Sequence, residues 1–184
     1  MEETIIALAK ASILMALNEP SDFNLTLARQ NFPQLNEQRA VFVTLRTLPN
    51  YKLRGCIGSL TAYRPLYKDI IVNAQHSALK DSRFKPLTKE EFKNISVEIS
   101  ILSTPKVLHY KDVDELKTKI EAFKDGVILS LGKHRATYLP SVWNELTTFD
   151  DFFSSLCLKA NLEKECLEQH PTLQTYQAKK YKEK

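Results

Sequence analysis

Hydrophobic residues recur every three or four positions in several stretches of the chain, a spacing that predicts amphipathic helices. The first stretch covers residues 4–18 and contains no proline before Pro20. Pro65 suits the first turn of a second helix, to about residue 80, because proline lacks the N–H that would be unpaired there. Further helices are predicted after Thr88, whose spacing to Glu91 is that of a capping box, from Val113 to Phe123, and after Thr148.

Alternating polar and apolar positions, together with runs of β-branched residues, predict strands. The predicted strands are residues 40–47, 51–57, 95–101, 127–131, 134–139 and 173–181. The first two are expected to form a hairpin around Pro49-Asn50, and Gly132-Lys133 is expected to join a second hairpin. Asp125-Gly126 is expected to end the helix that begins at Val113. The lysines of residues 173–181 favour an edge strand or a frayed end.

Because the strands come in hairpins with helices between them, we predict an α+β fold, a mostly antiparallel sheet with flanking helices. A doubly wound fold is not expected. We predict one domain over residues 1–184 and leave open a division into two lobes around a cleft. Residues 19–38 are a variable connection and a candidate hinge or lid. The C-terminal tail, residues 163–184, has the weakest pattern.

Composition is that of an ordered globular chain, with 184 residues, 43% of them hydrophobic and 26% charged. The net charge of +4 does not by itself indicate nucleic acid, nor does it exclude it. No apolar run reaches ~18 residues, so no membrane span is expected. The acidic start, Met1-Glu2-Glu3, is unlike a signal peptide. Three cysteines without CxxC spacing favour a reducing cytoplasm over a disulfide framework.

The candidate chemistry centres on residues 53–58, Leu-Arg-Gly-Cys-Ile-Gly, where Cys56 lies between two of the four glycines of the chain. A nearby cation or helix N-terminus makes a thiol more reactive. Arg54 would supply that cation if no bulge separates it from Cys56 on the strand. His76 is a candidate base, although a surface histidine is the simpler interpretation. The alternative is that Cys56 is a small packed residue.

Gly55 and Gly58 have two alternative interpretations. Their backbone N–H groups could form an anion-binding nest, completed by Arg54 or Arg135. They could instead form a tight turn or bulge that closes the strand. We expect Gly58 to adopt a positive φ and Gly55 to leave room for a ligand.

Asp81 and Arg83 form a candidate charge pair, which either pins its loop or binds a polar group of a substrate. The remaining histidines lack metal-ligand spacing, so we expect no metal site. The Gly-x-x-Gly of residues 55–58 fits neither a Walker loop nor a dinucleotide fingerprint, and we expect no cofactor.

Four blocks of sequence together resemble the AMMECR-domain family, of the prokaryotic type. They are the hexapeptide at residues 53–58 and the blocks at 41–45, 78–87 and 136–142. The resemblance, from the first helix to about Leu162, implies a cleft in which Cys56, Asp81 and Arg83 are catalytic. From the nest considered above, we expect ligand-binding roles for Arg54, Gly55, Gly58 and Arg135. The chain departs from the family pattern at Asn161, where related chains often have glycine.

The resemblance also implies partners. Similar prokaryotic proteins accompany a Memo-like dioxygenase relative and a radical SAM enzyme, in the AmmeMemoRadiSam system. We therefore expect a cytoplasmic protein that modifies or hands on a substrate in that system. The alternative is a non-catalytic module that binds a protein or RNA through the same cleft. An RNA site would need a basic face with exposed aromatic residues, and no segment shows one.

Overall fold

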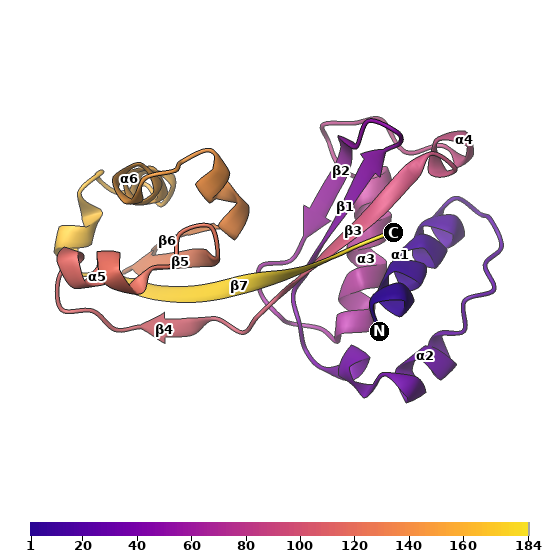
Figure 1. Ribbon diagram of the computed structural model, residues 1–184, viewed down its shortest axis with the longest axis horizontal. Helices are drawn as coiled ribbons and strands as arrows, with labels where there is room; N and C mark the ends of the chain where they lie inside the picture. Colours follow the sequence, from indigo (N-terminus) through magenta and orange to yellow (C-terminus); the bar gives the residue numbers. More distant parts are fainter. Residues whose placement is uncertain (184) are drawn as a thin grey trace. The chain divides into compact units, whose positions relative to one another are not determined.

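The computed structural model describes residues 1–183, which form two compact units (Figure 1). Unit 1 comprises Met1–Leu102 and the chain from Lys179 onward, and unit 2 comprises Ser103–Ala178. Helices and antiparallel strand pairs occur in both, so the predicted α+β class is confirmed.

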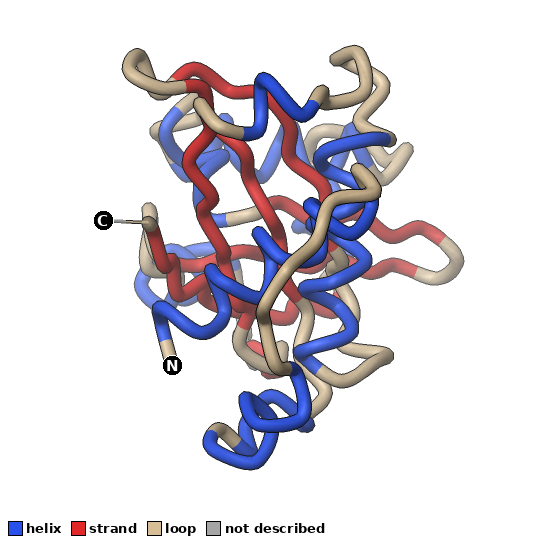
Figure 2. Tube along the Cα trace, turned by 90° about the vertical axis from the view of Figure 1, so that its right-hand side faces the viewer, coloured by secondary structure: helices blue, strands red, loops and turns tan. Residues whose placement is uncertain are grey.

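Unit 1 is built on a hairpin and two long helices. β1 (Val41–Thr47) pairs antiparallel with β2 (Lys52–Gly58) on one side and with β3 (Ile95–Leu102) on the other. The end of β7 (Thr172–Lys182) adjoins β3. The helices α1 (Glu2–Ala16) and α3 (Leu66–Leu79) contribute, with these strands, to one hydrophobic core (Figures 1 and 2). The predicted first hairpin and first two helices are therefore confirmed.

The alternation of β1 gives the sheet of unit 1 two different faces. Val41, Val43 and Leu45 are fully buried in the core with the helices. Because side chains alternate along a strand, Thr44 lies on the opposite face. The site described below lies on this second face.

Three short elements of unit 1 correspond to weaker sequence signals. The connection at residues 19–38 contains α2 (Leu25–Asn31), capped by Asn24, and a 3-10 helix, η1 (Pro33–Asn36). The predicted capping box is confirmed at α4 (Lys89–Phe92), where Thr88 and Glu91 bind each other's backbone N–H groups.

Unit 2 combines the second hairpin with short helices. Its elements are β4 (Lys106–Leu108), α5 (Val113–Lys119), β5 (Asp125–Leu131), β6 (His134–Tyr138), η2 (Pro140–Asn144), α6 (Phe149–Lys159), η3 (Cys166–Gln169) and the first part of β7. The rings of Trp143 and Phe152 stack at 3.8 Å in its core. Both the second hairpin and the Thr148 cap of α6 were predicted and are confirmed.

Three details of the predicted elements in unit 2 are wrong. β4 was not predicted, since it has only three residues. Thr175 of β7 pairs with both Lys106 of β4 and Val127 of β5, so β7 is an interior strand here and not an edge. Asp125 begins β5 and does not end α5, because the helix already stops at Lys119.

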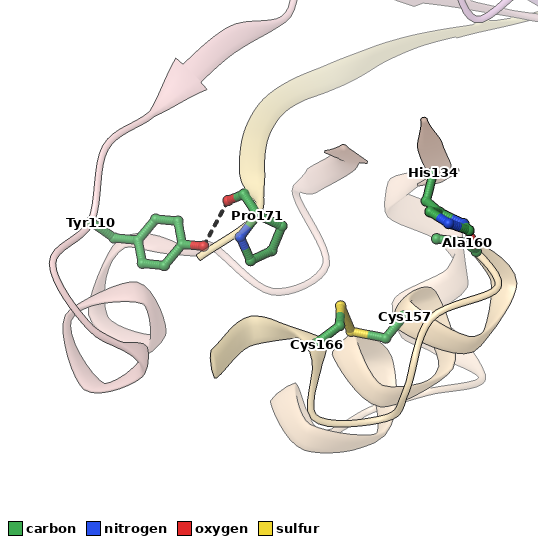
Figure 3. The surroundings of a disulfide bond; sticks show 6 residues. All are labelled: Tyr110, His134, Cys157, Ala160, Cys166 and Pro171. Carbon is green, nitrogen blue, oxygen red and sulfur yellow. Dashed lines mark hydrogen bonds between the residues drawn. A yellow bond between two sulfur atoms is a disulfide. The ribbon is translucent and has the colours of Figure 1, made fainter. Parts of the chain in front are cut away.

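A disulfide joins Cys157 to Cys166, so the expectation of unpaired cysteines is wrong (Figure 3). The two Cα atoms are 5.8 Å apart, within the ordinary range for a disulfide. Asn161, two residues after the end of α6, has φ +57°, and Leu162 N–H bonds back to Cys157 O, so the chain reverses after the helix. The pairing follows from this reversal, which cysteine spacing alone does not reveal. Across residues 1–183, no helix has the length and apolar character needed to span a membrane.

Candidate functional site

Cys56 lies on β2, and its side chain is on the face of the sheet that α1 and α3 do not cover. Its cross-strand partner is Thr44 of β1. The Sγ atom of Cys56 is 3.2 Å from the hydroxyl oxygen of Thr44, and the side chain is half-buried. Cys56 is the free cysteine of the chain, because the other two are in the disulfide. The residue is therefore neither fully packed nor fully exposed.

Asp81 and Arg83 bind the main chain of Cys56 from the loop that follows α3. The backbone N–H of Cys56 donates to Asp81 Oδ2 at 2.8 Å. Arg83 Nη2 donates to the carbonyl oxygen of Cys56 at 3.4 Å. Asp81 is buried, while 54% of the Arg83 side chain is exposed. The structure thus brings together the three residues predicted as catalytic.

The Asp81–Arg83 pair is bidentate and strongly polarised. Arg83 Nε and Nη2 donate to the two carboxylate oxygens at 2.9 and 2.7 Å, and the Arg83 backbone N–H adds a third bond. These bonds from the Arg83 side chain, with the N–H groups of Cys56 and Arg83, hold the pKa of Asp81 well below its usual range. The hydrogen bonds to Asp81 raise the pKa of Arg83. Both members of the pair are charged at neutral pH.

A bulge in β2 separates Arg54 from Cys56. Gly55 pairs with Leu45, but the next pair is Leu53 with Arg46, so Arg54 is an extra residue. A bulge of this kind redirects the side chain of the extra residue. Arg54 was expected to lie beside the Cys56 thiol only if no bulge separated the two residues. Because the bulge is present, they do not share a face of the strand.

Arg54 instead forms a buried anchor between β2 and the capping box. Its Nε and Nη2 atoms donate to the two carboxylate oxygens of Glu91 at 3.0 and 2.9 Å, and Nη2 also donates to Lys85 O. This bonding to Arg54 lowers the pKa of Glu91. Within residues 1–183 the buried Nη1 atom of Arg54 has no hydrogen-bond partner. A cavity of about 290 Å³ lies beside Arg54 and Glu91, and Cys56 does not line it.

Gly55 and Gly58 are required for close packing within the protein. A Cβ on Gly55 would lie 2.1 Å from the carbonyl oxygen of Ser77, and one on Gly58 would lie 2.2 Å from the ring of Phe42. The positive φ expected for Gly58 is wrong, because the described glycine with positive φ is Gly132. Gly55 was expected to leave room for a ligand. The main chain of α3 occupies that space instead.

The sequence reasoning missed a line of polar residues on α3 that positions β1 and β2. The Ser77 hydroxyl donates to Val43 O at 2.7 Å and accepts the N–H of Ile57 at 2.9 Å. Asp69 accepts the N–H of Val41, and Asn73 donates to the carbonyl oxygen of the same residue. All three side chains are buried.

A signal for this line was present in the sequence. Asp69, Asn73, Ser77 and Asp81 follow one another at intervals of four residues, which places the first three on one face of a helix. Their neighbours on the helix are apolar, so such polar residues need partners when the helix is buried. The N–H groups of Cys56 and Ile57 are bound by this line, so they do not form the open anion nest that was considered.

Two other predicted participants lie outside this cluster. Arg135 is on β6 of unit 2, opposite Ser130 of β5, and its part in the site stays a prediction. His76 is on α3, where burial, with Lys80 and Arg64, lowers its pKa. No hydrogen bond joins His76 to Cys56 in the described part of the chain.

The row of residues across the sheet continues from Cys56 and Thr44 to Glu98 of β3. Glu98 is buried and lies 3.1 Å from Arg46, with Lys180 and Lys182 at 3.9 and 3.8 Å. Over residues 1–183 no group of three or more histidine, cysteine or acidic side chains could hold a metal ion. The cluster around Cys56 therefore contains a thiol, the Thr44 hydroxyl and the Arg83 guanidinium group, and the carboxylate of Glu98 is next in the row.

Comparison with known proteins identifies the family. The family model described as AMMECR1 matches residues 6–181. Protein MJ0810 of Methanocaldococcus jannaschii is 38% identical over 135 residues, covering 72% of this chain and 67% of that protein. A protein of Aquifex aeolicus is 35% identical over 150 residues, covering 78% and 74%.

A solved structure agrees with these sequence matches. The crystal structure of the uncharacterized protein PH0010 from Pyrococcus horikoshii has a TM-score of 0.76 and 31% sequence identity to this chain. The match covers 98% of this chain and 90% of that one. The chain therefore belongs to the AMMECR1 family.

Proposed function

We propose that the chain binds an anionic group of a substrate at Arg83, and that the thiol of Cys56 is the reactive group of the site. The observation that supports this most directly is the shared anchor, Asp81. Its carboxylate accepts hydrogen bonds from both the N–H of Cys56 and the side chain of Arg83. The thiol and the cation are therefore held at a fixed separation.

Both groups keep capacity for a ligand. Arg83 Nη1 forms no hydrogen bond within residues 1–183, and most of the side chain is exposed. A guanidinium edge binds carboxylate or phosphate groups well, since its N–H groups match two acceptor oxygens. The polar contact of the Cys56 sulfur is the hydroxyl of Thr44.

In this proposal the chain works with a Memo-like dioxygenase relative and a radical SAM enzyme, as the family resemblance implies. A substrate with an anionic group is bound at Arg83 and is modified at, or handed on from, the thiol. The cytoplasm is the compartment expected for such a system. The chain's +4 charge is compatible with an anionic substrate without selecting one.

A second candidate is recognition without covalent chemistry through the same surface. It is favoured by the absence, within residues 1–183, of an imidazole or carboxylate group hydrogen-bonded to the sulfur of Cys56. General-base activation of a thiol usually needs such a group. A protein partner suits this candidate better than RNA, because the described cluster of Cys56, Asp81 and Arg83 contains no aromatic side chain to stack on bases.

The test measures binding of the full chain to each of the two partner proteins from the same organism by calorimetry. Arg83→Ala is expected to weaken binding, because it removes the exposed cation. Lys52→Ala is the matched control, since Lys52 is an exposed cation of β2 without an ion pair in the described residues. Equal affinities of these two variants would contradict the proposal. Arg135→Ala tests in the same assay whether unit 2 contributes.

Cys56→Ser separates the two candidates. If the thiol is reactive, this variant binds the partner normally but loses any covalent adduct with substrate, as seen by intact-protein mass spectrometry. If the chain only recognises its partner, wild type forms no adduct and the variant behaves like wild type.

A further inference from the structure

We propose that the outer face of the sheet of unit 1 docks a short acidic segment of a protein partner, one that also carries apolar side chains. The outer face is the side of the sheet that α1 and α3 do not cover. The docking surface on it consists of Leu53, Arg46, Lys180 and Lys182, with Tyr51 at its border. The inference goes beyond the proposed function and does not rest on it, because these residues are not those that hold the thiol or bind the anionic group.

Three cations surround one buried carboxylate on this face. Glu98 of β3 lies 3.1 Å from Arg46 Nε, and its carboxylate oxygens are 3.9 and 3.8 Å from the Nζ atoms of Lys180 and Lys182. One carboxylate balances one of these charges, so the group has surplus positive charge. The lysine side chains are 49% and 63% exposed, whereas Glu98 is buried. A partner therefore meets the cations and not the acid.

The strand register places the members of the docking surface on the same side of the sheet. Side chains alternate along a strand, and that of Leu45 is buried in the core, so that of Arg46 points to the outer face. Leu53 of β2 is the cross-strand partner of Arg46 and shares its face. The two lysines belong to the same face, because they approach the carboxylate of Glu98 that Arg46 binds.

The β2 end of the docking surface is apolar. Leu53 is 38% exposed, and Tyr51, in the turn before β2, is 58% exposed. Lys52 lies between them in the chain but is paired with Thr47, so it points to the other side of the strand from Leu53. Arg46 Nη1 donates to the carbonyl oxygen of Tyr51, which ties this apolar end to the cations. A partner segment therefore needs apolar side chains as well as carboxylates.

The width of the sheet sets the length of that segment. The strand order is β2-β1-β3-β7, so three strand spacings of about 4.8 Å, roughly 14 Å in all, separate Leu53 from the lysines of β7. A helix of about ten residues has this length. With apolar side chains at one end and carboxylates at the other, it would lie across the strands in one orientation. Complementary charge fixes such a register and speeds the encounter.

A nucleic acid fits the docking surface less well than an acidic protein segment. Its phosphates repeat along the whole strand and need cations along the whole path, whereas the β2 end of this surface is apolar. Single-stranded nucleic acid also binds by stacking successive bases on aromatic rings. Among the residues named for this surface, Tyr51 alone is aromatic.

The test measures binding of the full chain to a fluorescent peptide of about ten residues, with leucines at one end and glutamates at the other, by fluorescence anisotropy. We expect binding that weakens as salt is added, because salt screens exposed charges. Lys180→Ala/Lys182→Ala should weaken it about tenfold at low salt, the loss of two exposed ion pairs. The matched control is Lys117→Ala/Lys119→Ala, which removes two exposed lysines of the same spacing, each with its own acidic partner.

Two further measurements locate the peptide. Leu53→Ala should weaken binding of the leucine-containing peptide but not of a peptide with serine in place of leucine, and Leu158→Ala, which truncates an exposed leucine of unit 2, should change neither. A carbodiimide then couples peptide carboxylates to the amines beside them. Peptide mass spectrometry should find these links at Lys180 or Lys182.

Three results would overturn the inference: no binding of the acidic peptide at low salt, equal affinities of the two double-lysine variants, or links only at other lysines. Tighter binding of a single-stranded RNA of the same length than of the peptide would also overturn it, in favour of a nucleic-acid surface. If melting curves show that Lys180→Ala/Lys182→Ala does not fold, Lys180→Gln/Lys182→Gln replaces it with the same expectation.

Discussion

The backbone N–H of Cys56 donates a 2.8 Å hydrogen bond to the carboxylate of Asp81, a residue 25 positions later in the chain. The same carboxylate binds the guanidinium group of Arg83 through both of its oxygens. One buried acid thus connects the strand that carries the thiol to the exposed cation beside it. The loop after α3 is thereby part of the site as well as a connection.

Asp81 should make stability depend on pH in the acid range. Its carboxyl has a lower pKa in the folded chain than the value of about 3.9 in the unfolded chain, chiefly because it bonds to Arg83. The contribution is therefore present above about pH 4 and is lost as the pH falls through the folded-state pKa. Asp81→Asn should be less stable than wild type at neutral pH, and the difference should shrink in acid, as measured by urea unfolding.

The control for this experiment is Asp22→Asn, which changes an exposed carboxyl that forms no ion pair within residues 1–183. Its effect should be small and should not vary with pH. If Asp81→Asn and Asp22→Asn behave alike, Asp81 is not the anchor described above.

Alkylation should reveal one reactive cysteine in the native chain. Cys56 is half-buried and free, whereas Cys157 and Cys166 are paired and buried. Iodoacetamide should therefore label Cys56 alone without reductant, and all three cysteines only after reduction and unfolding. Peptide mass spectrometry measures this directly. Labelling of Cys157 before reduction would show that the disulfide is absent in solution.

Gly55→Ala should destabilise unit 1 by about 1–3 kcal/mol, the usual cost of overpacking. Its Cβ would lie 2.1 Å from Ser77 O, and a main-chain atom of a helix cannot move aside cheaply. Gly58→Ala should cost less, because the obstacle is the half-buried ring of Phe42, which can rotate. Chemical unfolding of both variants gives the comparison, and a larger loss for Gly58→Ala would contradict it.

The anchor between Arg54 and Glu91 should be worth more than a surface ion pair. Glu91→Ala leaves the carbonyl oxygen of Lys85 as the remaining acceptor of the buried Arg54 guanidinium, a loss of about 2 kcal/mol or more. Thr88→Ala is the matched control, because it removes the capping box alone and should cost about 1 kcal/mol. Urea unfolding at neutral pH measures both. Equal losses would mean that Glu91 acts only as a capping residue.

Reduction of the disulfide should lower the stability of unit 2. Cys157 and Cys166 are nine positions apart, and closing a loop of this size restricts the unfolded chain by roughly 3 kcal/mol. The double variant Cys157→Ser/Cys166→Ser should therefore melt at a lower temperature than wild type, and reductant should shift only the wild-type curve. Calorimetry with and without reductant tests this, and an unchanged melting temperature would contradict it.

Local patterns predicted most of the elements correctly. The helix after Pro65, the capping box of Thr88 and Glu91, and both hairpins depend on residues close together in the sequence. Interactions of this kind are decided by backbone geometry and by spacing along one element. The same patterns failed in two short elements. They placed the end of α5 too late and did not predict β4.

The sequence also selected residues that the structure brings together. Cys56, Asp81 and Arg83 were selected from the glycine-flanked cysteine and from the family blocks, and these three residues are in contact. The line of Asp69, Asn73 and Ser77 could have been found from its four-residue spacing. Its partners could not, because they are backbone groups of strands far away in the chain.

By itself, the sequence determined the local elements of this protein, its α+β class and the segment that carries the thiol. Only the tertiary structure decided that Arg54 turns to Glu91, that Gly55 admits the main chain of α3, and that Cys157 pairs with Cys166. The physical reason is that a bulge, a close approach and a disulfide each depend on the three-dimensional position of a second segment. Residue type and periodicity describe one segment at a time.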